Sequence, residues 1–214
     1  MEMFDAKYID AELEKIGARV KTRLSIYLIG GCAMSFRNLK EATKDADILF
    51  KARADCADFC GALFGAQYFE PVTITDEYDR LDALKMFENK DGFHLDLFVK
   101  KVCRKMRLTG SMSKRAEQYK KYGKMDVLLV SKEDIFLFKS LASEGRRRDL
   151  DDMRAIYPNL DWDAMMEELA VQDLSAGLVR HMIGRLEDFR KTYDLDVPIL
   201  GRMKKHAAAG KGRK

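Results

Sequence analysis

The sequence lacks the features of membrane-bound and secreted chains. In its 214 residues no apolar run approaches the length, about 18 residues, that is needed to cross a bilayer. The N-terminal stretch MEMFDAKYIDAELEK is charged and has no apolar centre, unlike a secretory signal peptide. The sequence therefore predicts a cytoplasmic protein that has no membrane partner.

The sequence also has little from which a zinc centre or a disulfide framework could be built. It contains four cysteines and three histidines. The cysteines form no CxxC pair, and no histidine lies at metal-ligand spacing from them. We therefore interpret Cys32, Cys56, Cys60 and Cys103 as free thiols, either buried or incidental.

The net charge of +4 comes from one end of the chain. Residues 202–214 hold six Lys and Arg and no acid, which leaves 33 basic against 35 acidic residues elsewhere. We expect 202–214 to be a basic, disordered tail. Such a tail either touches nucleic-acid phosphates or is simply a solvated terminus.

Length and composition predict one domain with an appended subdomain. A chain that is 47% hydrophobic can bury a sizeable core at this length. We place a core domain at 1–130 and a C-terminal helical subdomain at 131–201. Helically spaced apolar residues predict one amphipathic helix over 5–20 and another over 52–64.

The strongest chemical signal lies between Leu28 and Phe50, in LIGGCAMSFRNLKEATKDADILF. A short buried strand over 24–29 is followed by Gly30 and Gly31 and then by a helix-compatible segment, 32–39. A strand that breaks at glycines and restarts as a helix points backbone N–H groups into one concave spot, which suits phosphate oxygens. The glycine pair is otherwise an ordinary turn.

Two aspartates follow this cradle. Asp45 and Asp47 stand two residues apart at the start of a predicted strand, 45–50, so their carboxylates point the same way. Like charges on one face repel unless a cation lies between them, and carboxylates together with nucleotide phosphates are common Mg²⁺ ligands. The alternative is a solvated strand end.

A third aspartate stands in a second candidate strand. Residues 83–88 and 93–99 predict two strands joined by the hairpin turn 89–92. Alternation places His94, Asp96 and Phe98 on one face. An aspartate in an apolar strand is costly to bury unless it is paired or binds a metal. Asp96 is thus a candidate site residue, unless it lies at a solvent-facing position of an edge strand.

The segment 100–124 is strongly basic, with Tyr119 and Tyr122 between its lysines and arginines. Such a surface beside a metal site could hold an RNA backbone. It could equally be the wet side of an ordinary loop and helix. Residues 125–130 predict a further short strand that closes the sheet.

The helical part contains one unusual lysine and a pair of aspartates. Ser131 predicts the start of a helix that carries Lys139, and burial of an ammonium in such an apolar helix requires an anion such as a triphosphate. Its alternative is a stem that extends to water. Asp149 and Asp152 are three apart and share a helix face, where neighbouring arginines could pair with them. Asp173 is a candidate cap for a long helix over 174–193.

The spacing of the Gly-Gly and Asp-Ala-Asp motifs resembles the nucleotidyltransferase superfamily signature. The stretch EDIFLFKSLASEGRRRDLDDM is similar to the "EDL…K…A…R…KD…D" signature of AbiEii-like nucleotidyltransferases and the related DUF6036 group. With FHLDLF, the resemblance covers residues 24 to 160. Many relatives have a serine at the position of Gly31.

The resemblance implies an α+β, polymerase-beta-like fold, in which a mixed sheet has flanking helices and is followed by a C-terminal helical bundle. It implies an enzyme that uses Mg²⁺ or Mn²⁺ to transfer NMP from an NTP to an acceptor hydroxyl. Its site residues would be Gly30 and Gly31 for phosphates; Asp45, Asp47 and Asp96 for metal; and Lys139 and Asp149, or Asp152 in its place.

The acceptor that the resemblance implies is RNA, for example a tRNA 3′ end, in a toxin neutralised by a cognate antitoxin protein. A small-molecule acceptor is the second reading, because the same metal core serves both. A third is a non-catalytic nucleotide- or RNA-binding module. The three clustered aspartates and Lys139 argue against the third, since a purely structural domain has no need of them.

Overall fold

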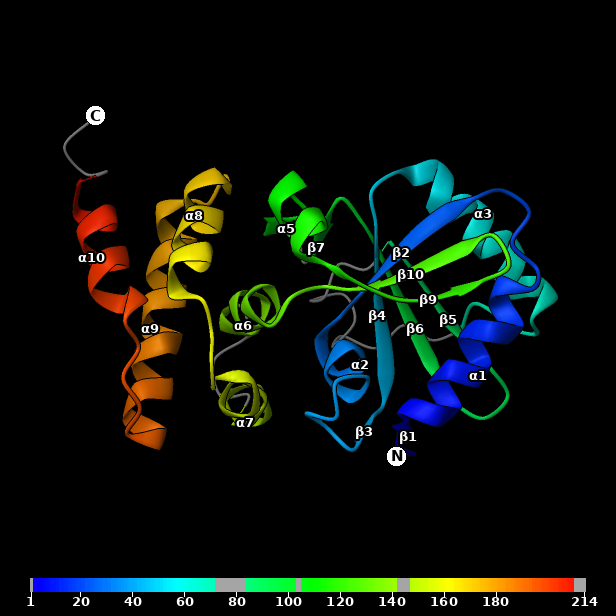
Figure 1. Ribbon diagram of the computed structural model, residues 1–214, viewed down its shortest axis with the longest axis horizontal. Helices are drawn as coiled ribbons and strands as arrows, with labels where there is room; N and C mark the ends of the chain where they lie inside the picture. Colours follow the sequence, from blue (N-terminus) through cyan, green and yellow to red (C-terminus); the bar gives the residue numbers. More distant parts are fainter. Residues whose placement is uncertain (1, 72–83, 103–104, 142–146, 210–214) are drawn as a thin grey trace. The chain divides into compact units, whose positions relative to one another are not determined.

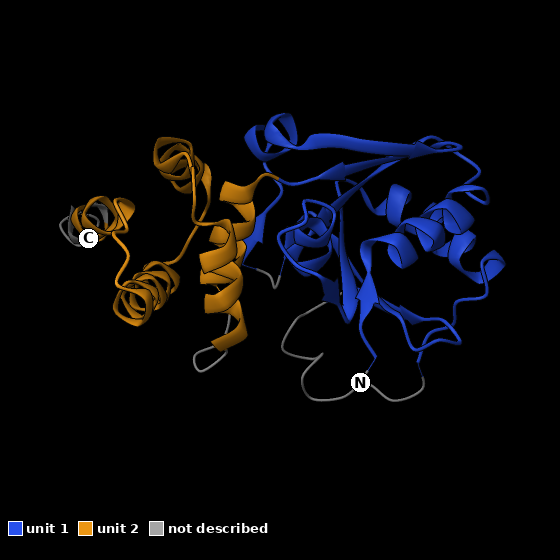
Figure 2. Ribbon diagram, turned by 60° about the horizontal axis from the view of Figure 1, so that its bottom comes forward, with its two compact units in different colours: residues 1–130 blue, residues 131–214 orange. Residues whose placement is uncertain are grey.

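The chain divides into two compact units, residues 1–130 and residues 131–214 (Figure 2). The computed structural model describes residues 2–71, 84–102, 105–141 and 147–209.

Unit 1 combines a sheet with helices (Figure 1). Its elements in chain order are β1 (Phe4–Asp5), α1 (Ala6–Gly17), β2 (Leu24–Ile29), α2 (Gly30–Ser35), β3 (Ala42–Thr43), β4 (Asp45–Phe50), α3 (Arg53–Gly65), β5 (Lys85–Glu88), β6 (His94–Val99), β7 (Lys101–Val102), β8 (Met106–Arg107), α5 (Gly110–Arg115), β9 (Glu117–Tyr122) and β10 (Met125–Leu129).

The described residues of unit 1 form one six-stranded mixed sheet in the order β5-β6-β4-β2-β10-β9. β4 is central: it pairs with β6 in parallel and with β2 antiparallel. β10 runs parallel to β2, and β9 and β5 are antiparallel to their neighbours at the two edges. β4 and β6 therefore begin at the same end of the sheet, where β2 ends.

One face of this sheet is apolar and covered by α1 and α3. Because strand side chains alternate, Ile26, Ile48 and Leu97 share this face, and none of the three is exposed to solvent. Phe59 of α3 packs on Phe50 of β4, with ring centroids 5.3 Å apart. Burial of this face contributes to the apolar core of unit 1.

The other face carries polar side chains at the end where β4 and β6 begin. Asp45 and Asp47 alternate with the buried Ala46 and Ile48, so both aspartates lie on this face. Asp96 of β6 shares it. The carboxylates therefore lie at one end of a face whose other side chains, Leu49 and Phe98 among them, are buried.

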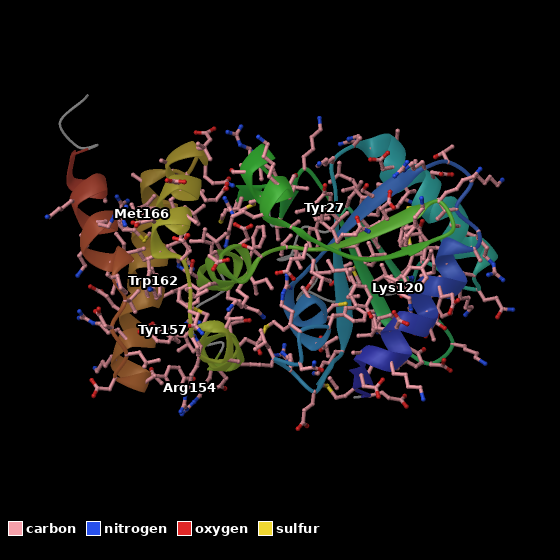
Figure 3. The ribbon with its side chains drawn as sticks, in the orientation of Figure 1. Tyr27, Lys120, Arg154, Tyr157, Trp162 and Met166 are labelled. Carbon is pink, nitrogen blue, oxygen red and sulfur yellow. The ribbon has the colours of Figure 1, made fainter. Side chains whose placement is uncertain are left out.

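Unit 2 is helical. Its elements are α6 (Lys132–Ser140), α7 (Arg147–Ile156), α8 (Trp162–Val171), α9 (Ala176–Tyr193) and α10 (Ile199–Ala209). Phe136 of α6 lies at its centre, with ring centroids 5.6 Å from those of both Trp162 and Phe189. Figure 3 labels Trp162 and its neighbour Tyr157. Met182, Leu186 and Phe189 of α9 are buried and belong to the core of this unit.

The α+β fold class expected from the sequence is confirmed, with a mixed sheet, flanking helices and a separate helical unit. Two local expectations are wrong. α2 begins at Gly30 itself and ends at Ser35, instead of running over 32–39. β10 does not close the sheet, because β9 (Glu117–Tyr122) pairs outside it as the edge strand. The sequence of β9, EQYKKY, is so charged that alternation of polar and apolar residues does not predict a strand there.

Two further corrections concern the C-terminal part. Ser175, and not Asp173, caps α9, since its hydroxyl accepts from the backbone N–H of Leu178 at 3.2 Å. The predicted disordered tail is wrong for residues 202–209, which continue α10. Met203 is 2% exposed, so this helix is held by burial of an apolar side chain. Residues 210–214 lie outside the described residues.

Cys32, Cys56 and Cys60 are free and buried, as expected, and Cys103 lies outside the described residues. Across the described ranges of the chain, no helix combines the length and the apolar character that a membrane span requires.

Candidate functional site

The three aspartates predicted to act together lie on one face of two neighbouring strands. Parallel pairing of β4 and β6 places Asp47 opposite Asp96 and Asp45 opposite His94. Residues that are opposite each other in a sheet point to the same side. Strand pairing therefore brings together two motifs that lie about fifty residues apart in the sequence.

Asp96 is the most unusual of the three. It is fully buried, and neither of its carboxylate oxygens accepts a hydrogen bond from any described residue. Burial, and then the charge of Asp45, raise the pKa of Asp96 from 3.8 to about 7. A buried carboxyl group without a partner is costly in a structural role, so a ligand is the physical reason to keep one here. The alternative of a solvent-facing edge position is excluded, because β6 lies between β5 and β4.

The glycine pair closes the same end of the site. Gly30 has a φ of +59°, and a Cβ added to it would lie 2.4 Å from Oδ2 of Asp47. A Cβ on Gly31 would lie 2.7 Å from Oγ1 of Thr43 and 3.6 Å from Nζ of Lys40. Side chains at either position would therefore intrude on the aspartate strand and on a neighbouring ammonium. The two glycines keep the backbone bare beside the carboxylates.

Replacement of Gly30 by alanine is expected to destabilise the protein more than the same change at Gly92. Both residues have positive φ, which costs a side-chain-bearing residue about 1–2 kcal/mol. At Gly92 no described atom lies within 4 Å of the new Cβ, whereas at Gly30 it collides with Asp47. Urea unfolding of Gly30→Ala and Gly92→Ala checks this. Equal losses of stability in the two variants would show that contact with Asp47 adds nothing to the cost of a side chain at Gly30.

The sequence did not predict two residues that lie beside the site, Thr43 and Lys40. The hydroxyl of Thr43 lies 3.4 Å from Oδ1 of Asp45 and can donate to it. Lys40 is the ammonium beside Gly31. No regular pattern marks either residue, since both stand in the segment between α2 and β4. Only the fold brings them to the glycines.

The residues fit a divalent ion held jointly with a substrate. No group of three or more His, Cys, Asp or Glu side chains is gathered closely enough to hold an ion among the residues that the structure describes. Mg²⁺, however, is typically bound by one or two carboxylates plus substrate phosphates, and not by an all-protein cage. Asp47 and Asp96, opposite each other, with Asp45 two residues along the strand, supply that donor set. The oxygens of Asp96, which accept no hydrogen bond from any described residue, are the observation that favours it.

The residues predicted from the helical signature lie together in unit 2. The ammonium of Lys139 is 2.8 Å from Asp149 and 2.8 Å from Asp152. Burial lowers the pKa of Lys139, but the two carboxylates raise it more, so the net shift is upward. The anion that the buried lysine requires is therefore supplied by the chain itself. Lys139 does not extend to water, since only 15% of its side chain is exposed.

The C-terminal part of the basic segment 100–124 makes contacts within unit 1. It includes the edge strand β9 and the hairpin after it. There Lys120 pairs with Asp10 at 2.9 Å, and Lys124 donates to the carbonyl of Lys21 at 2.7 Å. Tyr119 and Tyr122 also donate to Asp10. These tyrosines therefore fix α1 to the sheet edge and are not free to stack on bases.

Comparison with known proteins adds two solved structures. Lincosamide antibiotic adenylyltransferase LnuA, in its lincomycin-bound crystal structure, is 15% identical, with a TM-score of 0.48, over 74% of this chain and 100% of its own. JHP933 from Helicobacter pylori is 14% identical, with a TM-score of 0.44, over 94% of this chain and 91% of its own. No protein-family model matches the sequence, and no match is found among curated proteins. The AbiEii-like resemblance stays a prediction.

Proposed function

We propose that this protein is a metal-dependent nucleotidyltransferase. It would move a nucleoside monophosphate from an NTP onto an acceptor hydroxyl. The observation that carries the proposal is the placement of Asp47 and Asp96 opposite each other, with Asp96 buried and its oxygens unbonded to any described residue. Carboxylates so placed beside side-chain-free glycines suit a metal-bound triphosphate better than any structural purpose.

The residues of unit 1 take distinct roles in this reaction. Gly30 and Gly31 admit the phosphates close to the backbone, with the ammonium of Lys40 beside them. Asp45, Asp47 and Asp96 would hold Mg²⁺ or Mn²⁺. When bound, such an ion offsets the charge of the phosphates and lowers the pKa of the acceptor hydroxyl.

The chemistry is an in-line displacement at the α-phosphorus. The acceptor oxygen forms the new bond to phosphorus, the bond to the β-phosphate oxygen breaks, and pyrophosphate leaves. What the chain contributes is alignment of the two reacting groups and a fixed field for the charge that develops. Lys139 and Asp149, or Asp152, remain predicted participants from the sequence resemblance.

For the acceptor we propose RNA, in a toxin-like role. The basic composition of the segment 100–124 and the AbiEii-like resemblance support it, and a tRNA 3′ end and a cognate antitoxin protein follow from that resemblance. A small-molecule acceptor is the second candidate. It is kept because the same metal core serves both kinds of acceptor.

The test is a label-transfer assay. The protein is incubated with each labelled NTP, Mg²⁺ or Mn²⁺, and either total RNA or a panel of small hydroxyl compounds, and the labelled product is identified. Label on tRNA is expected. Label only on a small molecule would replace the RNA acceptor, and NTP binding without any transfer would favour a non-catalytic module.

Asp45→Ala is the control for this assay. It removes one carboxylate of the metal set, so label transfer is expected to disappear while the fold is kept. Asp126→Ala is its matched comparison, because Asp126 stands on a strand of the same sheet and pairs with the exposed Arg23 at 3.2 Å. Transfer that survived Asp45→Ala would overturn the assignment of the site.

A further inference from the structure

The carboxylate-bearing face of the sheet has a basic end opposite its acidic end. β4 and β6 are parallel, so the residues that follow them emerge together, away from Asp45 and Asp47. These residues are Lys51 after β4 and Lys100 and Lys101 after β6, and all three are exposed. We call Lys51, Lys100 and Lys101 the lysine end.

Backbone contacts hold the lysine end together. The N–H of Lys100 donates to the carbonyl of Phe50 at 2.8 Å, which fixes Lys100 beside Lys51. Lys100 has a φ of +64°, a conformation that side-chain-bearing residues rarely adopt. Its carbonyl accepts from the N–H of Leu108 at 2.8 Å, so the strained residue is held from both sides.

Lys51 shows on which face of the sheet this charge lies. Its ammonium sits 5.1 Å from the ring centroid of Tyr27, labelled in Figure 3. Tyr27 pairs with Leu49, two residues from Asp47 in β4, so Tyr27, Leu49 and Asp47 share one face. Lys51 therefore lies over the face that carries the candidate active site. Four residues separate it from Asp47, or about 13 Å of extended strand.

We infer that the lysine end anchors the phosphates of a single-stranded nucleic-acid acceptor while its terminal hydroxyl lies at the carboxylates. This inference rests on the proposed function, because it needs an acceptor hydroxyl to be held at Asp45, Asp47 and Asp96. A polymeric acceptor carries a phosphate at each nucleotide, so it can meet the lysine end while its terminal hydroxyl lies at the carboxylates.

The C-terminal part of the basic segment lies outside this site. Lys120, Lys121 and Lys124 belong to β9 and the turn after it. β9 is the third strand from β4 in the sheet order, or about 14 Å away at the usual spacing. Lys120 is also paired with Asp10. These three lysines therefore provide a matched control, because their replacement removes the same charge from the same unit of the protein.

The test measures RNA affinity directly, without transfer. Binding of a fluorescein-labelled single-stranded RNA is followed by anisotropy at several KCl concentrations, in the absence of NTP and divalent ions. For the full-length variant Lys51→Ala/Lys100→Ala/Lys101→Ala we expect at least about tenfold weaker binding. The slope of log affinity against log salt should fall by about 2, since each lost phosphate contact contributes about 0.7.

Lys120→Ala/Lys121→Ala/Lys124→Ala is expected to change the salt slope by less than half as much, and neither variant should alter the affinity for NTP. Equal losses in the two variants would overturn the inference, as would unchanged RNA binding in the first or a loss confined to NTP binding. Far-UV circular dichroism verifies that both variants fold. If RNA binding follows the lysine end but no NTP label is transferred, the proposed function fails and the anchor stands. The reverse result rejects the anchor alone.

Discussion

Asp96→Asn is expected to abolish nucleotidyl transfer and, at the same time, to stabilise the metal-free protein at alkaline pH. Transfer should fall at least about 10³-fold, because charge stabilisation by a metal site is worth several kcal/mol and 1.36 kcal/mol is a factor of ten in rate. A residue kept for its chemistry at the expense of stability shows this opposed pair of effects.

The sign of the stability effect follows from the pKa of Asp96. Burial and the charge of Asp45 raise it from 3.8 to about 7, so between these values the folded protein retains a proton that the unfolded chain releases. Stability therefore falls as the pH rises from 3.8 to about 7. At 1.36 kcal/mol for each pH unit, the ionised form costs on the order of 4 kcal/mol above that range. Asparagine has no charge to bury, so the variant escapes this cost.

Urea unfolding in EDTA, at acidic and alkaline pH, measures the effect. The variant should unfold at higher urea than the wild type above neutral pH, and the two should converge near pH 4, where Asp96 is protonated in the folded state. Asp126→Asn is the control, because its exposed pair with Arg23 is worth about 1 kcal/mol at most. A variant less stable than the wild type at alkaline pH would mean that Asp96 has a stabilising partner in solution.

Lys139→Met is expected to destabilise unit 2 by about 3–5 kcal/mol. Asp149 and Asp152 are nearly buried, with 5% and 8% of their side chains exposed, and both lie 2.8 Å from the lysine ammonium. Removal of the lysine leaves two buried like charges without the ammonium that both contact, which costs far more than the intact cluster contributes. Methionine keeps the apolar stem and so isolates the charge.

The single tryptophan, Trp162, belongs to unit 2, so its fluorescence during urea unfolding reports this loss. Adding Asp149→Asn and Asp152→Asn to Lys139→Met should restore most of the stability, because the two buried like charges are then removed together with the lysine. If Lys139→Met instead abolished transfer with stability unchanged, Lys139 would be a catalytic residue and not chiefly the counter-ion of this cluster.

The candidate site could be read from the sequence where it depends on local spacing. Alternation is enough to put Asp45 and Asp47 on one face of a strand, and a glycine pair after an apolar strand marks a tight strand-to-helix turn. Thr43, Lys40 and Lys51 could not be found this way. Each acts through a neighbour in space, and the segments around them have no periodicity.

The predictions of helices and strands are wrong where burial in the fold and the local propensity of the sequence favour different structures. The edge strand β9 is mostly charged, so its pairing with β10, and not its composition, makes it a strand. Residues 202–209 looked like a solvated tail because their charge hides the few apolar side chains, such as Met203, that hold α10 in place. In both cases tertiary contacts outweigh the local signal.

The sequence by itself determined the candidate residues and the chemical class they suggest, because carboxylate spacing and glycine position are local properties of the chain. The tertiary structure alone decided which of them meet. Parallel pairing of β4 with β6 brings Asp96 opposite Asp47, and the burial that results raises its pKa. The same pairing gathers Lys51 and Lys100 at the far end of that face, since residues after parallel strands leave the sheet together. Spacing along the chain carries no information about such pairing, because it depends on contacts between segments some fifty residues apart.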